Sequence, residues 1–82
     1  MDPLEDVERE LVLIKVNFNS KNRVHIIDIV NSVGAKVIDA GKKALLIEVS
    51  GDSRKINTIE KLLSTFGILE IVRSGKIASK KL

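Results

Sequence analysis

The residues best suited to binding chemistry form one polar run, Asn19-Ser20-Lys21-Asn22-Arg23, between an apolar segment and a helical pattern. At the start of a helix, backbone N–H groups without helical partners and the helix dipole attract anions such as a carboxylate. The side chains of Asn19, Ser20, Asn22 and Arg23 are therefore the candidate ligand-binding groups. Simple capping of the helix by Asn19 or Ser20 is the competing interpretation.

Groups for covalent or metal catalysis are missing from the sequence. The chain has no cysteine, and His25 is its only histidine. His25 falls on the polar side of a helical pattern without a carboxylate four residues away, so we expect it to be solvated. No nucleophile stands beside a base, and no glycine-rich phosphate loop is present. We therefore expect no enzyme, no catalytic residue, no metal site and no cofactor.

Composition indicates one small cytoplasmic domain that gains stability by self-association. Of 82 residues, 44% are hydrophobic, and Phe18 and Phe66 are the only aromatic ones. A domain this small has a marginal core, and no disulfide can reinforce it, so we expect a homodimer. The sequence has no secretory signal and no run long enough to span a membrane. The net charge of +3 is spread along the chain without stacking aromatics, so we expect no nucleic-acid partner.

Apolar periodicity divides the chain into six elements. Period-two segments predict strands, and spacings of three and four predict helices that end at Gly34 and Gly67. Asp52 is the expected cap of the second helix. The predicted organisation is a linker at 1–8, a domain at 9–75 and a basic tail at 76–82, with strands at 11–18, 35–40, 43–50 and 68–74, and helices at 21–33 and from 52 to 66.

This βαββαβ order predicts an α+β, ferredoxin-like fold. Two strands separated only by Gly41 and Lys42 must pair in antiparallel fashion. Right-handed crossovers then place the first and third strands at the centre of a four-stranded antiparallel sheet. Both helices are expected on one face of that sheet.

The other face of the sheet is predicted to be apolar. In the first strand, Leu11 and Leu13 alternate with the core residues, and in the later strands Leu46 and Val72 are placed to join them. Monomers rarely leave such a patch exposed, so we expect a second copy or a partner domain to cover it. We include Arg73 in this candidate interface and expect it to pair with Glu10 across strands. Simple alternation along the fourth strand puts Leu69 and Ile71 on one face of the sheet and Ile68 and Val72 on the other.

Several segments, in this order and spacing, resemble the C-terminal domain of the regulatory (small) subunit of acetolactate synthase. They are Val7–Val16 (VERELVLIKV), Asn22-Arg23, Leu46–Gly51 (LIEVSG), Phe66-Gly67-Ile68 and Glu70–Ala78 (EIVRSGKIA). The resemblance implies an ACT-like domain that docks on a thiamine-diphosphate-dependent catalytic subunit in branched-chain amino-acid biosynthesis. The family tends to place Arg-Gly near the end of this domain, where the chain has Lys80-Lys81.

Two alternatives stay open beside this regulatory interpretation. The first is an amino-acid sensor, an ACT-like domain that binds valine, leucine or isoleucine at a protomer interface. The family's full subunit resembles an N-terminal ACT domain followed by this one, and that first domain is credited with the main amino-acid site. The second is a metal- or nucleic-acid-binding ferredoxin-like domain, which the composition disfavours.

Overall fold

Two spacings of apolar residues determine the elements of this chain. Apolar residues at every second position form strands, and apolar residues three or four positions apart form helices. A computed structural model describes residues 8–78. The elements are β1 (Glu8–Asn17), α1 (Arg23–Ser32), β2 (Lys36–Ala40), β3 (Ala44–Gly51), α2 (Ser53–Ser64) and β4 (Ile68–Ala78). The predicted βαββαβ order is confirmed.

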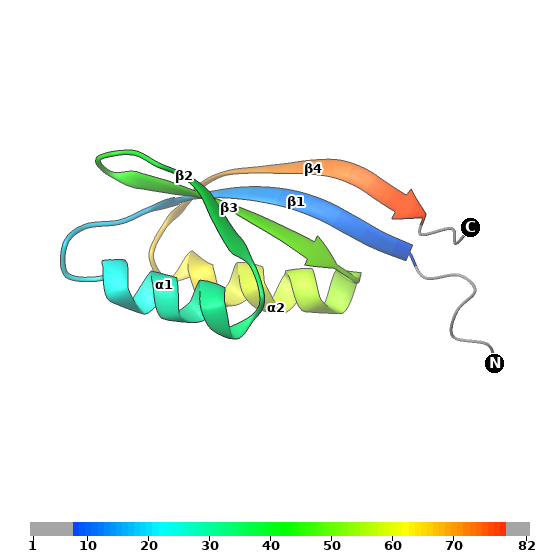
Figure 1. Cartoon of the computed structure of the whole chain (residues 1–82), viewed down its shortest axis with the longest axis horizontal. Helices are drawn as coiled ribbons and strands as arrows, with labels where there is room; N and C mark the ends of the chain where they lie inside the picture. Colours follow the sequence, from blue (N-terminus) through cyan, green and yellow to red (C-terminus); the bar gives the residue numbers. More distant parts are fainter. Residues whose placement is uncertain (1–7, 79–82) are drawn as a thin grey trace.

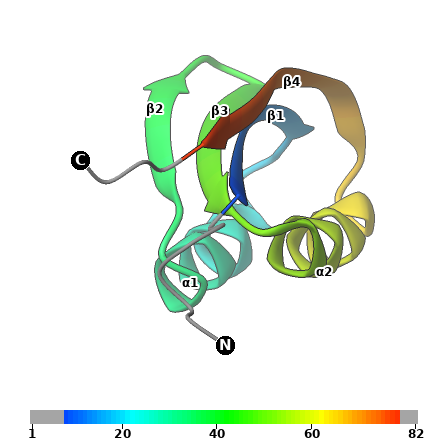
Figure 2. The same ribbon diagram turned by 90° about the vertical axis from the view of Figure 1, so that its right-hand side faces the viewer.

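The four strands form one antiparallel sheet in the order β2-β3-β1-β4. The first and third strands are therefore central, as the crossover argument predicted. Both helices lie against one face of the sheet, and the other face carries no helix (Figures 1 and 2). The expected ferredoxin-like α+β architecture is confirmed. We call the uncovered side the free face.

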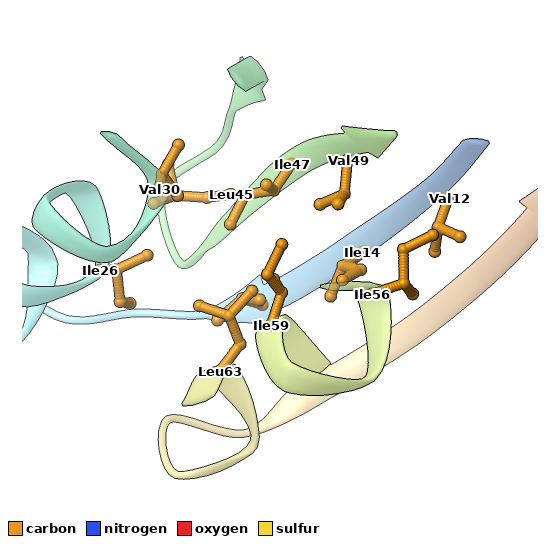
Figure 3. Close-up of a cluster of buried hydrophobic side chains, with 11 residues drawn as sticks. Val12, Ile14, Ile26, Val30, Leu45, Ile47, Val49, Ile56, Ile59 and Leu63 are labelled. Carbon is orange, nitrogen blue, oxygen red and sulfur yellow. The ribbon is translucent and has the colours of Figure 1, made fainter. Parts of the chain in front are cut away.

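The core is an aliphatic layer between the sheet and the helices. Every second residue of β1 and β3 points toward the helices, and each helix adds one apolar stripe (Figure 3). No polar side chain within residues 9–73 is buried in this layer. The eleven buried hydrophobic residues are Val12, Ile14, Val16, Ile26, Val30, Leu45, Ile47, Val49, Ile56, Ile59 and Leu63.

Local signals fix the helix ends. The Asp52 side chain accepts a hydrogen bond from the Lys55 N–H at 2.8 Å, so Asp52 caps α2 as predicted. Gly34 (φ 75°) follows α1 in the left-handed region, where the Ala35 N–H donates to the Val30 carbonyl. This bond closes the C-terminus of α1 in a Schellman motif.

Some boundaries differ from the expectations. α1 begins at Arg23, two residues later than predicted, because a separate turn precedes it. β4 continues to Ala78, so residues 76–78 of the predicted tail pair with β1 in the sheet. The predicted linker and tail otherwise fall at 1–7 and 79–82, which lie outside the described residues.

Both edge strands carry extra residues, whereas the central pair is regular. β1 and β3 pair without interruption. Between Val16↔Ile68 and Lys15↔Glu70, however, β4 contains one additional residue, Leu69. This bulge puts Ile71 on the helix side with Ile68, so the predicted opposition of Ile71 to Ile68 was wrong. β4 has a second register shift near its C-terminal end, and β2 has one at Ile38.

A half-buried ionic cluster joins β1, β4 and α2 on the helix side. Arg73 donates to Glu10 Oε1 through Nη1 and to Glu60 Oε2 through Nη2, each at 2.7 Å. Ser53 Oγ donates to the second oxygen of Glu10 at 2.9 Å. The predicted pair of Glu10 and Arg73 is confirmed, and Arg73 connects the edge strand β4 to the helix layer.

Replacing Ile47 with alanine should lower the free energy of unfolding by about 2–5 kcal/mol, because it opens a cavity in the core. The control is Leu62→Ala, whose side chain on α2 is 42% exposed and should change stability by less than about 1 kcal/mol. Urea denaturation measures both variants. Equal losses would contradict the assigned core.

Replacing Arg73 with methionine should lower the free energy of unfolding by about 1–2 kcal/mol, since Glu10 and Glu60 then lose a charged donor. Their side chains are only 14% and 20% exposed. The difference should shrink in about 1 M salt, which screens charges. Lys61→Met on α2, the helix that carries Glu60, is the control, because no ion pair of Lys61 is seen among the described residues. A loss no larger than that of the control would rule out a stabilising role for the cluster.

Candidate functional site

The central strand β1 supplies apolar side chains to both faces of the sheet. Val12, Ile14 and Val16 are fully buried against the helices, so the residues between them point to the free face. Leu11 and Leu13 lie there and are half-buried. A strand with apolar residues on both sides is typical of a sheet covered on both faces.

Leu13 lies at the centre of an apolar patch on the free face. It is directly opposite Val72 of β4 and Glu48 of β3, and Leu46 lies two residues from Glu48 on the same face. Val72 is 47% exposed. We call Leu11, Leu13, Leu46 and Val72 the free-face patch. The structure thus brings together four of the five residues that the sequence placed in one interface.

Arg73, the fifth residue, lies on the opposite side of the sheet. The Leu69 bulge sets the alternation of β4 so that Val72 faces away from the helices and Arg73 faces them. Its guanidinium is bound to carboxylates of β1 and α2. The placement of Arg73 with the free-face patch was therefore wrong, although its pairing with Glu10 was right.

The free face is hollowed beside Leu13. A depression of about 580 Å³ has Leu13, Leu46 and Val72 among its lining residues. Its rim carries charges of both signs. The remaining lining residues are Lys15, Asp39, Gly41, Lys42, Lys43, Ala44, Leu45 and Glu70.

The charged rim residues were missed by the sequence analysis. Asp39, Leu46, Lys15 and Glu70 form one row, in which each residue is the register partner of the next across the four strands. Alternation assigns each of these residues to a face of its own strand. Only the strand registers show that Asp39, Lys15 and Glu70 surround one hollow.

The polar run Asn19–Arg23 forms a turn closed by its own hydrogen bonds. Asn19 Oδ1 accepts from the N–H groups of Lys21 (2.8 Å) and Asn22 (2.9 Å). Asn22 Oδ1 accepts from the Asn19 N–H at 2.8 Å, and the Arg23 N–H donates to the Asn19 carbonyl. The backbone N–H groups within the turn, those of Asn19, Lys21, Asn22 and Arg23, are thus occupied. Asn19 therefore closes the turn that precedes α1, whereas Asn22, the N-cap residue of α1, makes no side-chain capping hydrogen bond. Ser20 and Arg23 lie exposed beside this turn.

Other kinds of site find no support in the part of the chain that the structure describes. Within residues 8–78, no three His, Asp or Glu side chains are placed to hold a metal ion together. The helices of this part are too short to cross a membrane. The free-face patch and its hollow are therefore the best candidate for a functional surface.

Comparisons with known sequences connect the chain to one family. A family model described as the small subunit of acetolactate synthase matches residues 9–81. The acetolactate synthase small subunit of Aquifex aeolicus is 43% identical over 76 residues, which cover 92% of this chain and 40% of that protein. The chloroplastic small subunit 1 of Nicotiana plumbaginifolia is 44% identical over 75 residues, covering 92% of this chain and 17% of that protein.

A solved structure agrees with these sequences. The crystal structure of the acetolactate synthase small subunit from Thermotoga maritima matches with a TM-score of 0.82 at 34% identity, covering 99% of this chain and 51% of that one. The chain spans less than half the length of the curated relatives compared here. The family model, however, matches nearly the whole of this chain and confirms the resemblance that the ordered segments carry. The chain belongs to the family of acetolactate synthase small subunits.

Proposed function

We propose that this chain is a non-catalytic regulatory domain that docks on the catalytic subunit of acetolactate synthase in branched-chain amino-acid biosynthesis. The observation that carries the proposal is the family match over residues 9–81. The thiamine diphosphate chemistry would belong to the catalytic subunit, and this chain would need no cofactor. The predicted cytoplasmic location and the predicted lack of a nucleic-acid partner stay predictions.

We further propose that two copies of the chain pair through the free-face patch. Because these side chains are already partly buried, covering the exposed remainder of each would contribute less than the roughly 1.5–3 kcal/mol of a fully buried leucine or valine. The edges of the sheet are less suited to pairing, because Leu69 and Ile38 interrupt the outer strands with bulges. Lys15, Glu70 and Asp39 around the hollow allow opposite charges of two copies to meet at the rim.

Amino-acid sensing is the second candidate function, and the geometry of the Asn19–Arg23 turn supports it less. A bound carboxylate would have to compete with the Asn19 and Asn22 side chains for backbone amides. The exposed Arg23 side chain remains available for an anion. Valine, leucine or isoleucine would then bind at a protomer interface that includes this turn.

Immobilised chain should retain the catalytic subunit of acetolactate synthase from the same source in a pull-down, because the docking surface belongs to this domain. Retention should be the same with and without valine, since the turn is closed by its own hydrogen bonds. The catalytic subunit on empty resin is the control, and excess free chain should compete.

Two results would change this proposal. Failure to retain the subunit would contradict docking by this domain. Retention that depends on valine, and loses that dependence on Arg23→Ala, would favour the sensing function.

Replacing Leu13 with lysine should shift a dimer toward monomer in sedimentation velocity, because it places an ammonium group at the centre of the free-face patch. Leu62→Lys introduces the same charge on α2 and should leave the mass unchanged. Circular dichroism checks that both variants are folded. If the parent chain is monomeric at high concentration, or if Leu13→Lys keeps its mass, pairing through this face does not occur.

A further inference from the structure

The two helices differ in how well their sequences support them. Half of the ten residues in α1 are β-branched, namely Val24, Ile26, Ile27, Ile29 and Val30. Such residues lose side-chain freedom in a helix and lower its intrinsic stability. α2 has only three among twelve, and it adds a capping Asp52 and a basic Lys61 in its last turn. α1 has no acidic residue in its first turn and no basic residue in its last one.

The packing differs in the same direction. α2 packs against the central strands β1 and β3 and buries Ile56, Ile59 and Leu63. α1 packs mainly against β2 and α2 and buries only Ile26 and Val30. β2 is a five-residue edge strand in which every residue is exposed and Ile38 interrupts the register. α1 and β2 are consecutive and share the side of the molecule away from β4 (Figure 2).

We infer that α1 and β2 form one cooperative unit that opens while β1, β3, β4 and α2 stay folded. Weakly packed elements open at a lower free energy than the whole domain does. Asp39 of β2 and Gly41–Lys43 of the adjoining turn form one wall of the free-face hollow. Opening of the unit therefore removes this wall. A copy bound over the hollow holds the unit closed, because it binds only the closed state. This last step rests on the proposed pairing.

Hydrogen exchange followed by NMR tests the unit in the monomeric Leu13→Lys chain, without any partner. Backbone amides of α1 and β2, corrected for their intrinsic rates, should exchange roughly tenfold or more faster than those of β1, β3 and α2. Equal protection of all four strands and both helices would overturn the inference.

Glycine and alanine variants, compared at one exposed asparagine in each helix, show which elements stay folded when the unit of α1 and β2 opens. Replacing alanine by glycine at an exposed helix position changes the opening constant about fivefold. In α2, Asn57→Gly compared with Asn57→Ala should speed exchange in β1, β3 and α2 and leave α1 and β2 unchanged, because α2 stays folded when the unit opens. In α1, Asn31→Gly compared with Asn31→Ala should speed exchange everywhere.

A single cooperative domain would show all amides shifting together for both pairs, and this result would also overturn the inference. In the parent chain, raising the protein concentration until the dimer forms should slow the exchange of the β2 backbone amides. An unchanged rate in β2 despite dimer formation would overturn the coupling to pairing and leave docking on the catalytic subunit unaffected.

Discussion

The structure depends on one strand, β1, which must be apolar on both of its faces. It lies between β3 and β4, so its backbone is paired on both sides. Val12, Ile14 and Val16 hold the helices, and Leu11 and Leu13 face away from them. The ten residues of β1 therefore contribute both to the stability of the core and to the apolar character of the free face. A sequence that made the free face polar would lose the apolar surface proposed for pairing.

The rest of the domain is arranged unevenly around this strand. On the β4 side, Arg73 ties the edge to α2 through Glu60 and to β1 through Glu10. On the β2 side, the connection to the core consists of the short strand, the two buried residues of α1, and partly buried residues such as Ile29 and Val33. This asymmetry is what the inferred opening of α1 and β2 requires, because the β4 side preserves the fold while the β2 side opens.

Much of the fold could be predicted because its signals are local. The alternation of Val12, Ile14 and Val16 defines a strand, and Asp52 and Gly34 mark helix ends by their own chemistry. The free-face patch followed from the same alternation. The face of Arg73 and the rim of the hollow could not be predicted, because they depend on strand registers. A single bulged residue, Leu69, reverses the alternation in β4, and no local sequence pattern predicts this bulge.

That bulge also determines where the chain can change its length. Leu69 is the extra residue in the pairing of β4 with β1, so its deletion would leave Glu70, Val72 and Arg73 on the faces they now occupy. The pairing of β1 with β3 has no such extra residue, so a one-residue deletion within either strand would reverse the faces of the residues beyond it. The chain can thus lose one residue at the bulge and keep Arg73 among the carboxylates, whereas the regular central pair of strands has no residue to spare.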